Sequence, residues 1–70
     1  MLIMEAIGPR GEELAMAAGA ARDIAVGWDG EFNSATFDAD SIDDSELEAV
    51  IVEELDDQEP DWRSHLRLVD

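Results

Sequence analysis

The chain has 70 residues, and its 19 acidic residues oppose only four arginines and no lysine, so the formal net charge is −15 at pH 7. Such a charge excludes ordinary binding to nucleic acid and to anionic membranes, because both surfaces would repel it, and it favours a basic protein partner. The absence of cysteine excludes disulfides and zinc–thiolate sites. With an apolar fraction of 46%, the sequence predicts one small folded acidic domain over residues 1–70 rather than a disordered tail.

The first part of the chain predicts a short strand and then a helix. Residues 1–4 are apolar and predict a strand or an extended arm, which a Gly-Pro pair separates from the next segment. A helix is expected over about 11–22, and Gly19 within it permits close packing although it costs about 1 kcal/mol relative to alanine. The face expected to be buried consists of mostly small residues at helical spacing, namely Leu14, Ala17, Ala18 and Ala21.

The next segment predicts a β-hairpin. Residues 24–28 alternate as a strand, an Asp-Gly pair gives a strong turn signal, and residues 31–38 return as a second strand with Phe32 available to the core. A two-residue loop would place Trp28 opposite Glu31, and a longer loop would change that register. Both alternatives remain open at this point.

A second helix and a terminal strand complete the expected elements. Ser45 and Glu48 have the spacing of a capping box, which predicts a helix over roughly 44–55. Its apolar stripe consists of Leu47, Val50, Ile51 and Leu55. Residues 62–69 alternate as a strand with one buried face, and we expect this strand to pair with the hairpin.

The expected fold class is therefore α+β, in the order (β)αββαβ. It consists of a three- or four-stranded antiparallel sheet packed by two helices. If residues 1–4 join the sheet, the order matches a compressed ferredoxin-like arrangement.

The sequence contains no recognisable catalytic or metal-binding constellation. His65 is the one histidine and is expected to be an exposed or half-buried strand residue, and no cysteine or lysine is present to act as a nucleophile. Residues 38–40 begin like a calcium loop, but Asp43 stands in place of the turn glycine and Ala49 in place of the bidentate glutamate. We expect a protein without enzymatic activity, cofactor or dedicated metal site.

The arginines and tryptophans near the end of the chain have structural explanations. Arg63 and Arg67 are expected to share a strand face and to pair with nearby acids. Trp28 and Trp62 are expected to be core residues of a small domain. No apolar run is long enough to span a bilayer and nothing resembles a secretory signal, which predicts a cytoplasmic protein.

Acidic residues are concentrated in one part of the chain. Twelve of the 19 carboxylates fall within residues 38–61, which contain no Lys, Arg or His. Residues 44–57 carry seven of them, about one per 3 Å of helix, whereas duplex DNA carries one charge per roughly 1.7 Å. The acids of this helix are expected on its outer, solvent-facing side. Acids of the hairpin and of the loop after it are expected to lie beside them and to raise the charge density toward that of DNA. The candidate partner-binding residues are Asp29, Glu31, Asp38, Asp40, Asp43, Asp44, Glu46, Glu48, Glu53, Glu54, Asp56 and Asp57.

Three short motifs resemble a stretch of the small acidic phage-encoded anti-CRISPR proteins that mimic DNA. These motifs are Trp28-Asp29-Gly30-Glu31, then, after a gap, Thr36-Phe37-Asp38, and then Asp40-Ser41. The resemblance implies binding to a Cascade-type, type I CRISPR surveillance complex where its basic channel receives target DNA. It also implies that Asp29, Glu31, Asp38 and Asp40 contact the lysines and arginines of that channel, whereas the helix acids are added on periodicity alone.

Two other functions agree with the same charge pattern. One is an immunity protein or antitoxin that caps a basic nuclease or toxin. The other is a generic salt-adapted acidic domain, for which acids spread over all faces are expected. Whether the chain acts as a monomer or as a homodimer stays open at this point.

Overall fold

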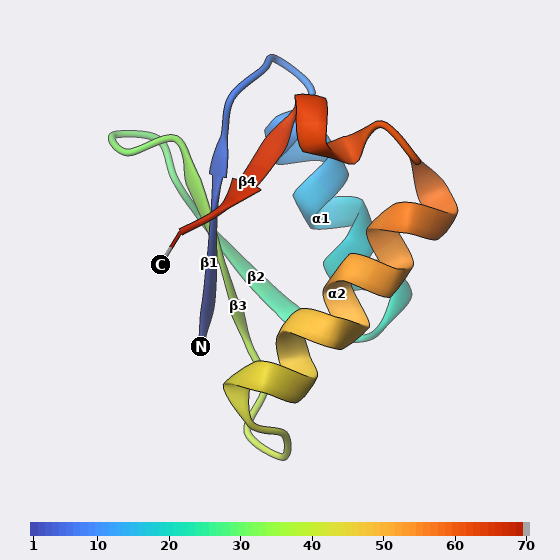
Figure 1. Cartoon of the computed structure of the whole chain (residues 1–70). Helices are drawn as coiled ribbons and strands as arrows, with labels where there is room; N and C mark the ends of the chain where they lie inside the picture. The colour runs from blue at the N-terminus through green and yellow to red at the C-terminus, as the bar shows by residue number, and fades with distance from the viewer. Residues whose placement is uncertain (70) are drawn as a thin grey trace.

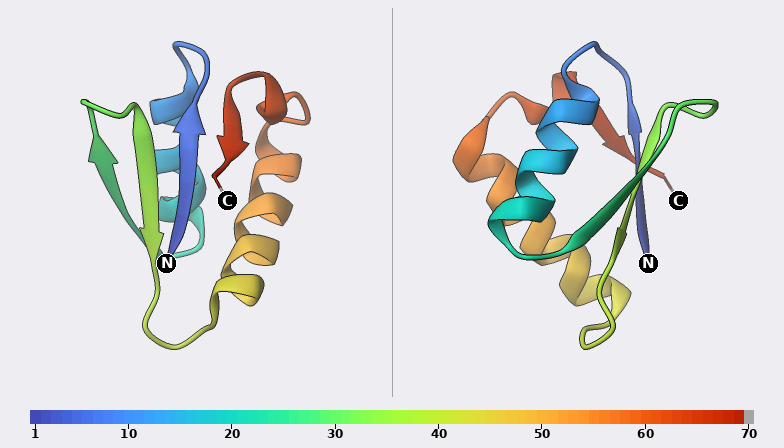
Figure 2. Two further views of the ribbon diagram at one scale, coloured as in Figure 1. Left: turned by 60° about the vertical axis from the view of Figure 1, so that its left-hand side comes forward. Right: turned by 180° about the vertical axis from the view of Figure 1, so that it is seen from behind.

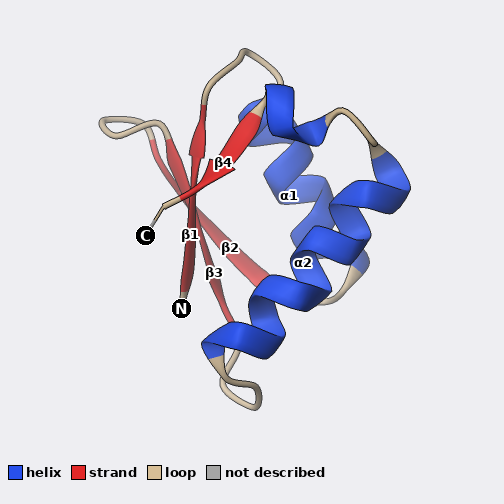
Figure 3. Ribbon diagram, in the orientation of Figure 1, coloured by secondary structure: helices blue, strands red, loops and turns tan. Residues whose placement is uncertain are grey.

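A four-stranded antiparallel sheet with two helices on one face forms the frame of the computed structural model, which describes residues 1–69 (Figures 1 and 3). In chain order the elements are β1 (Leu2–Ala6), α1 (Gly11–Ala21), β2 (Ala25–Asp29), β3 (Ser34–Asp38), α2 (Asp44–Gln58), the 3-10 helix η1 (Trp62–Ser64) and β4 (Leu66–Leu68). The strands lie in the order β2-β3-β1-β4. The expected α+β class is confirmed, and because β1 lies inside the sheet the arrangement is the ferredoxin-like, or split βαβ, topology.

The end of the chain differs from the expected terminal strand in two ways. Residues 62–64 form η1 rather than a strand, and β4 contains three residues. The expected pairing of this strand with the hairpin is also wrong, because β4 pairs with β1 through Met4 and Leu68. The 3-10 turn lets the Trp62 side chain enter the core, where it is 1% exposed, before the chain extends.

The core lies between the sheet and the two helices. It consists of alternate strand residues and of one stripe from each helix, including Leu2, Met4, Leu14, Ala15, Ala18, Ala35, Phe37, Leu47, Ile51, Leu55, Trp62 and Leu66. The buried face of α1 differs from the expected one, since Ala17 and Ala21 are exposed whereas Ala15 and Gly19 are buried. Gly19 decides this orientation, because a Cβ there would lie 2.1 Å from the Val26 Cγ2 atom.

The hairpin has a four-residue loop, so the two-residue alternative is excluded. Asp29 pairs with Ser34 across the strands, leaving residues 30–33 in the loop. The Asp29 Oδ1 atom accepts hydrogen bonds from the backbone N–H groups of Glu31, at 2.9 Å, and Phe32, at 3.3 Å. This side-chain turn takes Phe32 out of the strand. The expectation that Phe32 belongs to the core is therefore wrong, and it is 67% exposed.

Helix α2 begins at Asp44, as expected, but its N-cap lies two residues before Ser45, the expected cap. Asp43 is the N-cap, and its Oδ1 atom accepts a hydrogen bond from the Glu46 N–H at 2.8 Å. Ser45 is thus inside the helix, and the expected role of Ser45 as cap is wrong. Asp43 and Glu46 have the same spacing as the expected pair, and aspartate is an equally good cap, so the spacing alone did not choose between them. Within residues 1–69 no helix has the length and apolar character needed to cross a membrane.

Candidate functional site

All four arginines of the sequence form ion pairs inside the molecule. The pairs are Arg10 with Glu59 at 2.9 Å, Arg22 with Glu54 at 2.7 Å and with Glu53 at 3.4 Å, Arg63 with Asp56 at 3.7 Å, and Arg67 with Glu5. The expected pairing of Arg63 and Arg67 with acids is confirmed, although Arg63 lies in η1 rather than on a strand. No arginine is left to neutralise the remaining carboxylates.

Glu54 lies between the two helices and not on the outer face of α2. It is 9% exposed, and its carboxylate accepts hydrogen bonds from Gln58 Nε2 and from Arg22 Nε, both at 2.7 Å. The hydrogen bonds from Gln58 and Arg22 hold the pKa of Glu54 below its ordinary value. The hydrogen bond that Arg22 donates to Glu54 raises the pKa of Arg22. The expected outward position of Glu54 is therefore wrong. Its spacing of three residues from Ile51 and seven from Leu47 places it on the buried stripe, and this signal was present in the sequence.

Five other candidate acids have structural partners, and one of them is Glu53, which pairs with Arg22 as described above. Asp29 and Asp43 hold the hairpin turn and the start of α2, as described above. Asp56 accepts a hydrogen bond from the Trp62 indole Nε1 at 2.6 Å, and Asp44 pairs with the terminal amine of Met1. These carboxylates stabilise local structure whether or not they also meet a partner.

Six candidate acids are exposed and, among the described residues, show neither an ion pair nor a side-chain hydrogen bond. They are Glu31, Asp38, Asp40, Glu46, Glu48 and Asp57. Glu46, Glu53 and Asp57 follow one line along α2, since they are seven and four residues apart. We use the name α2 acidic surface for the exposed acids of α2, of the loop before it and of the end of β3, leaving out Asp56 because its carboxylate binds the Trp62 indole. They are Asp38, Asp40, Asp43, Asp44, Glu46, Glu48, Glu53 and Asp57.

The hairpin acids do not join this surface. Figures 1 and 2 show the β2–β3 loop on the opposite side of the molecule from α2, whereas the β3–α2 loop leads directly into that helix. The expectation that Asp29 and Glu31 lie beside the helix acids and close the gap in charge density is therefore wrong. Asp38 and Asp40 also belong to the motifs that resemble anti-CRISPR proteins. They lie at the end of β3 and in the β3–α2 loop, directly before α2.

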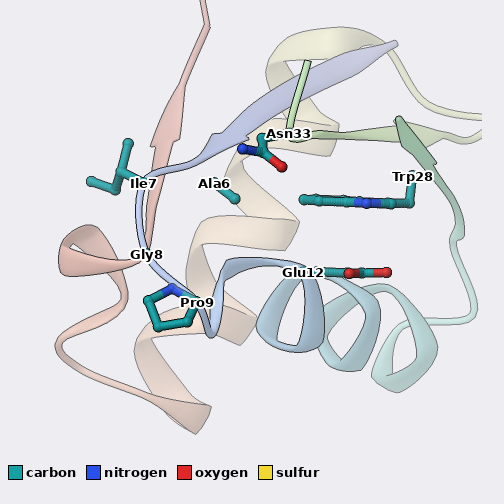
Figure 4. Close-up of a pocket in the computed structure, with 7 residues that line it drawn as sticks. All are labelled: Ala6, Ile7, Gly8, Pro9, Glu12, Trp28 and Asn33. Atoms are coloured by element: carbon teal, nitrogen blue, oxygen red, sulfur yellow. The ribbon is translucent and has the colours of Figure 1, made fainter. Parts of the chain in front are cut away.

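A pocket of about 400 Å³ lies where the end of β1, the start of α1 and the hairpin meet. It is lined by Ala6, Ile7, Gly8, Pro9, Glu12, Trp28 and Asn33 (Figure 4). Trp28 is half-buried and packs against the core, so its expected core position is confirmed in part, but its indole also lines this pocket. Glu12 comes from the first turn of α1, and no pattern in the sequence predicted that it would lie near Trp28.

No catalytic or metal-binding arrangement is visible in the described part of the chain. His65 is half-buried at the end of η1, and its Nδ1 atom has no hydrogen-bond partner among residues 1–69. Over the same residues, no three His, Cys, Asp or Glu side chains are arranged to hold a metal ion. The absence of enzymatic activity stays a prediction.

In comparisons with known proteins, no family model, no curated protein and no solved structure matches the chain.

Proposed function

We propose that this protein is a polyanion mimic that inhibits a nucleic-acid-binding protein by occupying its basic channel. The carrying observation is that every arginine is paired internally while the α2 acidic surface remains exposed to solvent. The net charge of −15 is distributed over a molecule whose longest axis is 30 Å, about one charge per 2 Å. Duplex DNA carries one per about 1.7 Å, so a groove lined with lysine and arginine for phosphates attracts both.

A type I CRISPR surveillance complex is the partner we propose, on the resemblance of the hairpin motifs. Asp38 and Asp40 support this partner, since they belong to those motifs and also to the α2 acidic surface. Asp29 supports it less, because its carboxylate is bonded to its own turn. An immunity protein or antitoxin would use the same electrostatic contact on a basic nuclease or toxin.

Competition for DNA tests the proposed partner. A purified type I surveillance complex and labelled target duplex are titrated with this protein at two salt concentrations. We expect loss of DNA binding at low salt and inhibition at least about tenfold weaker between about 50 and 200 mM salt, because the contact is electrostatic. No loss of DNA binding at large molar excess would reject this complex as the partner, and the same titration with a basic nuclease would then test the immunity-protein alternative.

Two double variants with equal charge test the α2 acidic surface. E46K/D57K reverses two acids of that surface, and E13K/E31K reverses two exposed acids on α1 and on the hairpin loop. Each pair includes one residue from the first turn of a helix, Glu46 or Glu13, so that part of the effect on helix dipoles is matched. Asp57 lies in the last turn of α2, where a lysine is favourable, so the fold of both variants is checked by thermal unfolding. We expect E46K/D57K to lose inhibition and E13K/E31K to keep most of it. Equal losses would mean that net charge acts without a defined surface, as for a generic salt-adapted domain.

A further inference from the structure

Trp62 shows how this molecule binds a cation beside an indole. The Arg63 guanidinium lies over the Trp62 ring, with Cζ 4.2 Å from the ring centroid. Asp56 accepts the indole N–H at 2.6 Å and lies 3.7 Å from the Arg63 guanidinium. An indole, a carboxylate and a guanidinium are thus in mutual contact, which combines a cation–π interaction with an ion pair.

The pocket at Trp28 contains two of these three chemical groups. Trp28 from β2, Glu12 from α1 and Asn33 from the hairpin loop lie around one space (Figure 4). Ala6 and Pro9 add apolar surface at its wall. Its volume of about 400 Å³ is ample for a single side chain. Trp62, in contrast, is 1% exposed and is closed to other molecules.

The cation for this pocket has to come from another molecule. The sequence contains four arginines and no lysine. Each arginine pairs with a carboxylate other than Glu12, as described above. A net charge of −15 also draws cationic groups of a partner toward the protein.

We propose that the Trp28 pocket binds an arginine side chain of a basic protein partner. The guanidinium stacks on the Trp28 ring and donates hydrogen bonds to the Glu12 carboxylate and to the side-chain oxygen of Asn33, while Ala6 and Pro9 contact its methylene groups. Arginine fits better than lysine, because a planar guanidinium both stacks on an aromatic ring and presents paired donors to a carboxylate. This inference rests on the proposed function only in taking the partner to be a basic protein.

A titration followed by NMR tests the pocket without any nucleic-acid-binding complex. The ¹⁵N-labelled protein is titrated with an acetylated, amidated Gly-Arg-Gly peptide, and the two indole N–H signals are observed. We expect a saturable shift of the Trp28 signal and little change in that of Trp62. The matching peptide with citrulline, which has the same shape without the charge, should bind at least about threefold more weakly.

Glu12→Gln and Glu13→Gln form a matched pair of variants. Both residues are exposed in the first turn of α1 and both substitutions remove one charge, but only Glu12 lines the pocket. We expect E12Q to weaken peptide binding about threefold or more and E13Q to leave it nearly unchanged. Equal effects, or equal shifts of both indole signals, would overturn the proposal in favour of general attraction to a negative surface.

The two proposals fail separately. If the peptide binds at Trp28 but the protein does not compete with DNA, the arginine pocket stands and the proposed channel is rejected. If the protein competes with DNA but the peptide does not shift Trp28 selectively, the pocket is rejected and the α2 acidic surface remains the proposed contact.

Discussion

Gly19 is the position where α1 and the following strand come closest. A Cβ at this residue would lie 2.1 Å from Val26 Cγ2 and 2.9 Å from the carbonyl oxygen of Ile24. The turn between α1 and β2 is tight, since the Ile24 N–H donates a hydrogen bond to the Gly19 carbonyl oxygen at 2.8 Å. A larger residue therefore has to push the strand away from the helix.

Gly19→Ala should destabilise the protein even though alanine is the better helix former. Alanine gains about 1 kcal/mol in helix propensity, but overpacking of this kind costs about 1–3 kcal/mol. We expect a net loss of up to about 2 kcal/mol, measured as a lower urea midpoint. Val26→Ala removes one of the two obstructing groups, so G19A should be less harmful in a V26A background. A G19A variant more stable than wild type would contradict the close approach.

At the scale of elements, Glu54 connects the two helices through Arg22 and Gln58. Because these hydrogen bonds lower the pKa of Glu54, the folded protein binds a proton at this carboxylate less readily than the unfolded chain does. The stability from this contact is complete at neutral pH. It is lost as the pH falls through the ordinary carboxyl range to the lower value of the folded state.

The stability difference between wild type and Glu54→Gln should therefore shrink as the pH falls from 7 to about 3. Urea unfolding at several pH values measures this difference. Glu48→Gln is the control, since Glu48 is exposed on the same helix. At pH 7, Glu48→Gln should leave the free energy of unfolding unchanged or raise it slightly, because removing this charge reduces repulsion among the acids. Parallel pH profiles for the two variants would show that Glu54 acts only through net charge.

The elements differ in how far the sequence could predict them. Leu47 is followed by Val50 and Ile51, three and four residues later. These residues share one face of a helix but lie on opposite faces of a strand, and α2 forms where this pattern predicts a helix. Residues 62–69 alternate in the sequence, but only residues 66–68 form a strand, and Ser64 is exposed although Trp62 and Leu66 are buried. Trp62 and Leu66 are buried in either arrangement, so the pattern could not separate a strand from a 3-10 turn. The hairpin register depended on the Asp29 side chain, which bonds to its own loop, and an Asp-Gly pair alone does not fix loop length.

The candidate site was predictable as a composition but not as a surface. The sequence alone shows that acids are concentrated between residues 38 and 61, and these residues form the end of β3, α2 and the loops on either side of α2. Their division into exposed and structural groups depends on partners distant in sequence, such as Arg22 for Glu54. The Trp28 pocket also required tertiary structure, because Glu12 and Trp28 meet only when α1 packs beside β2.

At the scale of the whole molecule, self-repulsion should make stability depend on salt. The Debye length is ~30 Å at 0.01 M and ~3 Å at 1 M ionic strength. The longest axis of the protein is 30 Å, so at 0.01 M ionic strength nearly every carboxylate is within range of the repulsion from the others. We expect Tm to rise with salt, by about 4–8 °C for each 1 kcal/mol of repulsion that is relieved.

Thermal unfolding over this range of salt checks the prediction, with E46K/D57K as the control. Each reversal adds two charge units, so this variant has a net charge of −11 instead of −15 and should show a smaller rise. A Tm that is independent of salt in both proteins would mean that repulsion contributes little to folding stability.

The strand order β2-β3-β1-β4 leaves two strands at the margins of the sheet. The three-residue β4 offers little backbone to a neighbour, but β2 has five residues and a glycine at its centre. Open margins of this kind allow copies of a protein to join strand to strand, and like charge is one means of keeping them apart. Near pH 4.1, where the charges balance, that barrier disappears. The acidity that opposes folding in dilute buffer is thus also what keeps the protein dispersed, so acid conditions that relieve intramolecular repulsion favour self-association along β2.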